Sequence, residues 1–221
     1  MPYHWDFAFL WRYVVLFERG VAVTLGFTAG TIALGLVIGL VVGMGRLSKS
    51  WLVNAPLVAF IEAFRCTPLL VQIIWFYYAL PVLLGLQIPA TIAALLVLSF
   101  YTGAFYAEIF RGGIVSIEAG QWDAARALGL GRWPMMRHVI LPQAIRRMVP
   151  PFVNQSITQL KNTSLVSTIA VPDLLYQGTL ITADTYRPLE VYTVVALIYF
   201  AMLFPSTMVA QAYERRLARG R

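Results

Sequence analysis

The sequence QWDAARALGLG, from Gln121 to Gly131, is polar and rich in small residues, although apolar segments lie on both sides of it. Most residues from Asp123 to Leu128 are good helix formers, and Asp123 is expected in the first turn, where the helix dipole favours an acidic side chain. Gly129 and Gly131 can end this helix by adopting positive φ. The stretch therefore predicts a short surface helix between segments that belong in a membrane.

The residues that follow predict a second helix after a tight turn. Pro134 suits the first turn of a helix, where its missing N–H is not needed. Pro142 is expected to interrupt this second helix, because proline removes a backbone donor and clashes with the preceding turn. The adjacent Ala124 and Ala125 would let the first helix approach a flat or grooved surface closely.

The rest of the chain is too apolar for a soluble domain. Of its 221 residues, 59% are hydrophobic and 12% are charged, whereas soluble domains are about half apolar and a quarter charged. About 20 helical residues cross the hydrocarbon layer of a bilayer, and five apolar segments reach that length: 20–45, 51–84, 88–110, 151–171 and 189–212. We therefore predict an all-α fold, an integral membrane bundle of about five transmembrane helices that forms a single domain over residues 1–221.

Two absences narrow the function classes. The start of the chain has no basic region followed by a cleavage site, so the first span is expected to remain as an anchor. The single cysteine, Cys66, excludes an intramolecular disulfide, and no spacing of residues predicts a metal site.

Basic residues are distributed unevenly between the two sides of the expected bundle. They concentrate after the first, third and fifth segments, at Arg46, Lys49, Arg111, Arg126, Arg132, Arg137, Arg146, Arg147, Arg215, Arg216, Arg219 and Arg221. The loops on the opposite side contain a single basic residue, Arg187. The positive-inside rule therefore places the C-terminus and the loop 111–150 in the cytoplasm and the N-terminus outside. It also accounts for the net charge of +7 without a nucleic-acid partner.

Glycines recur along the first segment at Gly26, Gly30, Gly35, Gly39 and Gly43. Small residues at this spacing allow two helix backbones to approach closely, and such packing is what associates helices in lipid. A helix contact within the chain is favoured over a dimer interface.

Polar residues inside the apolar segments mark a candidate path through the membrane. Glu62 and Arg65 lie three residues apart on one helical face and can pair, while Pro68 favours a break in the same segment. Lys161 lies in the middle of a polar run, and a charge at membrane depth costs at least about 2.5 kcal/mol. Either these residues fix helices to one another, with Lys161 as a buried tether, or they line a polar path. The candidate path comprises Glu62, Arg65, Thr67, Gln155, Gln159, Lys161, Asn162, Thr163 and Ser164.

The loop also carries a specific motif. The pattern EAA, three residues, G, nine residues, I, one residue, LP matches Asp123, Ala124, Ala125, Gly129, Val139, Leu141 and Pro142. With it the chain resembles the membrane subunits of bacterial ABC importers, in particular the polar amino-acid permease branch. Three further segments, IEAFRCTPLLVQ, GAFYAEIFRGGIVSIEAGQ and LKNTSLVSTIAV, are similar to elements of that branch. The resemblance covers approximately residues 60 to 175.

The resemblance implies that the loop 111–150 is a cytoplasmic coupling loop that docks into a groove on an ATPase subunit. The residues assigned to ATPase coupling are Asp123, Ala124, Ala125, Gly129, Leu141 and Pro142. The implied assembly, in the bacterial inner membrane, contains a second permease subunit in a homodimer or heterodimer, two cytoplasmic ATPase subunits and a periplasmic substrate-binding protein that delivers a polar amino acid. Because the chain has no GxxxxGK[ST] motif, ATP and Mg are expected in the partner ATPase, and no cofactor is expected in this chain.

Two positions depart from the family pattern. Asp123 stands where the motif has glutamate, so its side chain has a shorter reach. Asn162 stands where an aspartate is common, which would make a cationic amino acid a poorer substrate, while Lys161 would favour a substrate that bears a carboxylate.

Two other classes of protein compete with this interpretation. A membrane enzyme would need a nucleophile and base or a metal site, but the two histidines, His4 and His138, lie in no cluster of ligands. We therefore expect neither catalytic residues nor a metal. A channel or ion-driven carrier has no need of the loop from Asp123 to Pro142.

Overall fold

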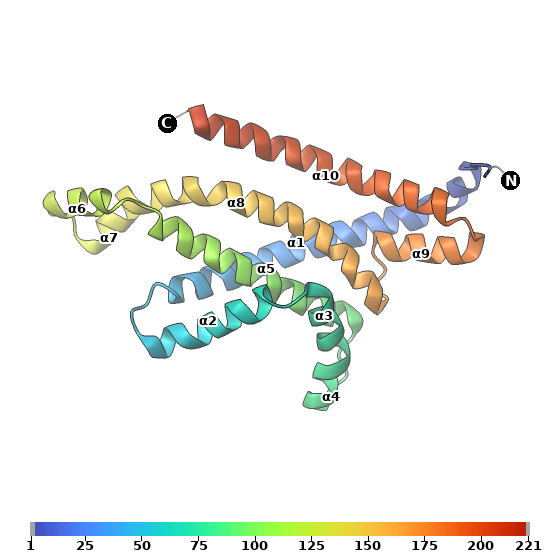
Figure 1. The fold of residues 1–221 in the computed structure, drawn as a ribbon, viewed down its shortest axis with the longest axis horizontal. Helices are drawn as coiled ribbons and strands as arrows, with labels where there is room; N and C mark the ends of the chain where they lie inside the picture. The colour runs from blue at the N-terminus through green and yellow to red at the C-terminus, as the bar shows by residue number, and fades with distance from the viewer. Residues whose placement is uncertain (1–2, 220–221) are drawn as a thin grey trace. The chain divides into compact units, whose positions relative to one another are not determined.

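The computed structural model describes residues 3–219, except for the side chains of 213, 214 and 216–219. Arg216, Arg219 and Arg221, three of the basic residues used for orientation, therefore have side chains outside the described part. Over the described range every regular element is helical (Figure 1), which agrees with the predicted all-α fold. The elements are η1 (Ala8–Tyr13), α1 (Val14–Gly45), α2 (Trp51–Arg65), α3 (Leu69–Ile74), η2 (Trp75–Ala79), α4 (Leu80–Leu84), α5 (Ala90–Val115), α6 (Ala119–Ala127), α7 (Arg132–Met135), η3 (Met136–Ile140), α8 (Leu141–Asn162), η4 (Thr163–Ile169), α9 (Leu174–Thr185) and α10 (Pro188–Arg219).

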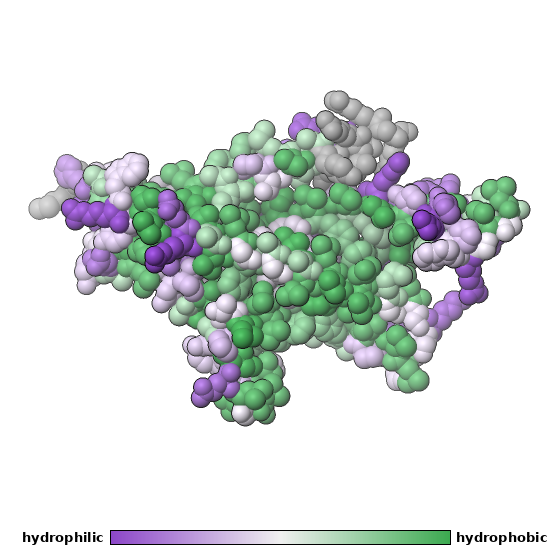
Figure 2. Space-filling view, turned by 180° about the vertical axis from the view of Figure 1, so that it is seen from behind, coloured by the Kyte–Doolittle hydropathy of each residue, from purple (hydrophilic) through white to green (hydrophobic). Residues whose placement is uncertain are grey.

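Three helical stretches among the described residues are long and apolar enough to cross a membrane: Ala8–Gly45, Ala90–Val115 and Pro188–Ala212. The pair Trp51–Arg65 and Leu69–Leu84 passes the same test together, as a broken span or a re-entrant segment. Hydrophobic residues accordingly cover much of the face seen in Figure 2, and hydrophilic residues gather in separate patches.

The predicted span at 151–171 has different bounds in the structure. Its helix, α8, already begins at Leu141 and ends at Asn162, and a 3-10 helix, η4, follows it. Length and apolar composition together do not mark α8 as a span, because its residues include three prolines, three charged side chains and several amides and hydroxyls. The segment is helical as expected, but it is the most polar of the long helices.

The chain forms two compact units. Unit 1 combines the chain up to Ile32 with Pro68–Leu98 and Ile157–Met208, and unit 2 combines Ala33–Thr67 and Ser99–Ser156 with the chain from Val209. Helices α1, α5, α8 and α10 each contribute residues to both units.

In unit 1, the start of α1 packs against the start of α9. A Cβ at Gly20 would lie 2.8 Å from the Cα of Leu174, so the two backbones are nearly in contact. The hydroxyl of Thr24 accepts a hydrogen bond from the backbone N–H of Leu174 at 3.1 Å. The residues buried around this contact are Leu10, Phe17, Leu174, Ile181, Val191 and Val195.

Asp173, the N-cap of α9, is a fully buried carboxyl group next to this contact. It accepts hydrogen bonds from the backbone N–H of Tyr176 at 2.9 Å and from the hydroxyl of Tyr199 at 3.3 Å. Burial raises the pKa of Asp173 from 3.8 to about 6, although the hydrogen bonds lower it in part. The fold therefore disfavours the ionised form of this group.

In unit 2, the second half of α1 packs against α5 through its glycines. A Cβ at Gly35 would lie 2.9 Å from the Cβ of Thr102, and one at Gly43 would lie 2.7 Å from the carbonyl oxygen of Ala107. The predicted glycine contact within the chain is thus confirmed for Gly35, Gly39 and Gly43. It does not extend to Gly26, where an added Cβ would meet no described atom within 4 Å.

We predict that Gly39→Ala destabilises the protein, because its Cβ would lie 2.5 Å from the Cβ of Tyr106 and 3.1 Å from the backbone nitrogen of Ala107. Overpacking of this kind costs about 1–3 kcal/mol. Gly26→Ala is the matched control in the same helix. Thermal unfolding in detergent measures the effect, and equal melting temperatures for the two variants would contradict the packing argument.

A second prediction concerns Asp173→Asn, which keeps a capping side chain but cannot ionise. Because the folded state raises the pKa of Asp173, the wild type loses stability as the pH rises from about 4 through about 6. The melting temperature of Asp173→Asn should therefore exceed that of the wild type by a margin that is larger at pH 8 than at pH 5. The exposed Asp123→Asn is the control, and a margin independent of pH would count against the buried ionisation.

Candidate functional site

The loop between α5 and α8 has a hydrophobic core of its own. Ala125, on α6, is 2% exposed and packs among Ile114, Ile117, Met135, Ile140, Ala144 and Met148. Ala124, the neighbouring alanine of the motif, is exposed. The motif predicts the same role for both alanines, but their environments differ, because Ala125 packs inside the loop and Ala124 lies on its surface.

Helix α6 begins earlier than predicted. It starts at Ala119, with Glu118 as its N-cap, so the prediction of Asp123 in the first turn is wrong. The four residues before Asp123, from Ala119 to Trp122, are already helical. Asp123 instead forms an exposed ion pair with Arg126, at 3.0 Å.

Gly129 ends α6 as predicted. Its φ is +70°, its N–H donates to the carbonyl of Arg126 at 2.9 Å, and the N–H of Leu130 donates to the carbonyl of Ala125 at 3.1 Å. These two bonds form a Schellman cap, which needs the left-handed backbone that glycine adopts without strain. The same expectation for Gly131 is wrong, because its φ is −63° and it serves as the N-cap of α7.

Pro142 does not interrupt the second helix. The chain stays helical from Arg132 to Asn162, with a π-turn, η3, at Met136–Ile140. The N–H of Leu141 donates to the carbonyl of Met136, five residues back. This wider turn relieves the clash that the ring of Pro142 would cause in an α-helix.

The exposed surface of the loop combines charged residues, such as Asp123 and Arg126, with small and apolar ones. Leu128 is 80% exposed and Trp133 is 71% exposed, although apolar side chains of this size usually pack. We define the candidate docking face by five of the exposed residues, which are Asp123, Ala124, Ala127, Leu128 and Trp133. Gly129, Leu141 and Pro142, the other predicted coupling residues, are exposed as well.

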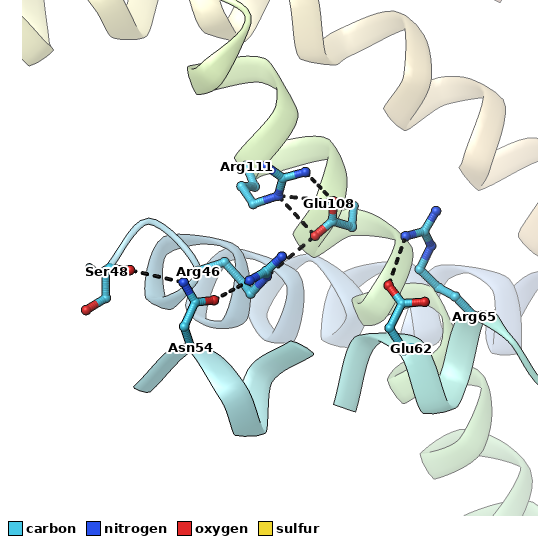
Figure 3. A network of polar contacts seen from close by, with 7 residues as sticks. All are labelled: Arg46, Ser48, Asn54, Glu62, Arg65, Glu108 and Arg111. Carbon is cyan, nitrogen blue, oxygen red and sulfur yellow. Dashed lines mark hydrogen bonds and ion pairs between the residues drawn. The ribbon is translucent and has the colours of Figure 1, made fainter. Parts of the chain in front are cut away.

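A network of charged and polar side chains joins α1, α2 and α5 inside unit 2 (Figure 3). Glu108 on α5 accepts a hydrogen bond from Nη2 of Arg111 at 2.7 Å and lies 3.7 Å from Nε of Arg46, which directly follows α1. Arg46 in turn donates to the side chain of Asn54 on α2. Because these residues are far apart in the sequence, no spacing rule predicts the link between Arg46 and Glu108.

The predicted pair of Glu62 and Arg65 forms, with 3.9 Å between Oε1 and Nη1. The guanidinium of Arg65 also lies over the ring of Phe105, at 5.4 Å from its centroid. The predicted break follows directly, because Pro68 has an extended backbone between α2 and α3. Thr67, at the break, donates its hydroxyl to the carbonyl of Ala63 at 2.6 Å.

The remaining candidate path residues lie at the end of α8 and the start of η4. Gln159 is fully buried and donates to the hydroxyl of Thr31 at 3.1 Å. Thr163 is also buried, and its hydroxyl donates to the carbonyl of Leu160. Both residues therefore stabilise unit 1.

Lys161 is exposed in the last turn of α8, so it is not buried in the middle of its helix. Its carbonyl accepts the hydroxyl of Ser164 at 2.8 Å. The side-chain amide nitrogens of Asn162 and, in unit 2, Gln155 are buried without a hydrogen-bond partner among the described residues. An unpaired buried amide is costly, and these two nitrogens have donors that no described residue uses.

Comparison with known proteins gives these features a common context. Residues 35–219 match the model of the family described as binding-protein-dependent transport system inner membrane component. The glutamine transport system permease protein GlnP of Escherichia coli (strain K12) is 39% identical over 96% of this chain and 97% of its own length. The arginine transport system permease protein ArtQ of Bacillus subtilis (strain 168) is 34% identical over 90% of this chain and 91% of its own.

Solved structures agree with the sequence relatives. A crystal structure of an amino acid ABC transporter with histidines contains a chain that is 36% identical and superposes with a TM-score of 0.91, covering 97% of this chain and 100% of that one. The MetNI methionine ABC transporter, at 23% identity and a TM-score of 0.70 over 91% of this chain and 98% of that one, shares the fold. The relatives are permeases rather than enzymes, and the chain belongs to the family of inner membrane components of binding-protein-dependent transport systems.

Proposed function

We propose that this chain is the permease subunit of an ATP-driven importer for a polar amino acid, and that its loop 111–150 couples transport to a partner ATPase. One observation carries the coupling role. The loop is packed around the buried Ala125, while Asp123, Ala124 and Leu128 on the same helix are exposed. A short helix that exposes small side chains beside charged ones is suited to docking into a groove.

The proposed assembly contains two permease subunits, as a homodimer or heterodimer, two ATPase subunits and a periplasmic binding protein. ATP and Mg would be bound by the ATPase, and this chain would bind no cofactor. Permeases for glutamine and arginine among its relatives support an amino acid as the substrate. The basic residues around the loop support an orientation with the loop and the C-terminus in the cytoplasm and the N-terminus outside.

We assign the translocation path to the polar residues at the break after α2 and at the end of α8. The unpaired amides of Gln155 and Asn162 and the exposed Lys161 support this assignment, because they offer donors that the fold does not use. Donors and a positive charge suit a substrate carboxylate. With asparagine rather than aspartate at 162, a neutral or acidic amino acid is favoured over a cationic one.

We predict that Gly129→Val uncouples the importer, because a β-branched residue is strongly disfavoured at a φ of +70° and would distort the end of α6. Gly131→Val, two residues away at a φ of −63°, is the matched control. Co-purification of the ATPase and the amount of amino acid imported per ATP hydrolysed measure the effect.

The expected result is that Gly129→Val inserts normally but loses the ATPase or falls about tenfold in import per ATP. Gly131→Val should behave like the wild type. Normal coupling in Gly129→Val would remove the loop from the coupling role, and a wild-type chain that transports alone in liposomes would favour a channel or carrier.

The substrate assignment predicts that Asn162→Asp shifts selectivity toward cationic amino acids, because it adds a negative charge at the proposed path. Uptake of glutamate, glutamine and arginine, each presented with a matching binding protein, measures the shift. Asp123→Asn, a charge change away from the path, is the control. An unchanged order of the three substrates would place Asn162 outside the path.

A further inference from the structure

Glu108 occupies an unusual position in a membrane-spanning helix. Its side chain is 20% exposed and is held between two guanidinium groups, Arg111 on its own helix and Arg46 after α1. A carboxylate in a membrane-spanning helix is costly unless it is paired. Because Glu108 pairs with two arginines from different parts of the chain, the contact is part of the fold and not an isolated surface ion pair (Figure 3).

The same stretch of α5 reaches the coupling loop. Directly after Glu108, Ile109 and Phe110 pack against the loop core, and Ile114 belongs to that core. Gly113 lies so close to Met148 on α8 that a side chain there would overlap it. A displacement of the loop therefore acts on α5 one turn from Glu108.

On its other side, the network reaches the turn between α1 and α2. Arg46 donates to the side chain of Asn54, and the amide of Asn54 donates to the carbonyl of Ser48 at 3.1 Å. Leu47, the residue after Arg46, packs against the loop core. The turn is thus tied to α5 by charge and to the loop by an apolar contact.

Apolar packing already holds α2 on α1 and α5, because Ile61 is buried with Val42 and Ala107 and an added Cβ at Gly45 would overlap Leu57. The ion pair of Arg46 with Glu108 adds a charged link at the turn itself. Without the carboxylate of Glu108, Arg46 and Arg111 would both lose their ion pair, and the charged link between the turn and α5 would be lost.

We propose that Glu108 is a positioning residue that makes the α1–α2 turn and α2 follow the coupling loop as one body. The proposal rests on the coupling function proposed above. It assigns to Glu108 the transfer of loop movement to the helix that carries Glu62 and Arg65.

The test compares Glu108→Gln, which removes the charge, with Glu108→Asp, which keeps it, in the complete importer in proteoliposomes. Glu18→Gln is the control, because Glu18 is an exposed glutamate on α1 in unit 1, outside the coupling loop. Glu108→Gln should assemble with its ATPase in normal amounts but import about tenfold less per ATP. Glu108→Asp should recover much of that loss, and Glu18→Gln should match the wild type.

A second measurement reports position directly. Spin labels at Lys49 and Val115, both exposed in unit 2, are placed in a Cys66→Ser background. The distance distribution between them should broaden in Glu108→Gln but not in Glu18→Gln, and this holds for the isolated permease if the variant fails to assemble. An unchanged distribution, or unchanged import per ATP in an assembled Glu108→Gln complex, would overturn the proposal. Failure of the wild type to couple would instead contradict the proposed function.

Discussion

The close approach of α1 to α5 is the contact on which unit 2 depends. Lipid offers no hydrophobic drive for two apolar helices to associate, so they must gain contact energy by fitting together. Gly35, Gly39 and Gly43 let the α1 backbone reach the backbone of α5. This contact fixes the position along α5 at which α1 ends, and it thereby places Arg46 beside Glu108.

The loop that follows α5 is a small folded body. Ala125 is buried in its core and cannot contact a partner protein. Ala124 and Leu128 are exposed on its surface. The candidate docking face is therefore held in shape by the loop's own core, which would lower the ordering cost of binding the proposed ATPase partner. The same core includes the end of α5, so the membrane helix and the loop share side chains.

Local rules predicted the local features well. The break at Pro68, the pair of Glu62 and Arg65 and the end of α6 at Gly129 each depend on a few neighbouring residues, and the structure confirms them. The start of α6 was misplaced because helix propensity does not mark a boundary sharply. The contact of Arg46 with Glu108 depends on helix packing and could not be predicted from sequence spacing. The motif residues identified the loop but could not separate buried Ala125 from exposed Ala124.

The π-turn before Pro142 has a counterpart, because η2 at Trp75–Ala79 also directly precedes a Leu-Pro pair. A π-turn takes up one residue more than an α-turn, and one residue rotates a helix by about 100°. The extra residue thus sets the rotation of α8 about its axis at which Ala144 and Met148 face the loop core. If Pro142 were replaced and no residue were deleted, the proline that favours the π-turn would be gone, although the extra residue would remain. The number of residues in the π-turn Met136–Ile140 and the presence of Pro142 are therefore linked. A deletion in this turn would remove the need for the proline, and a loss of the proline would favour such a deletion.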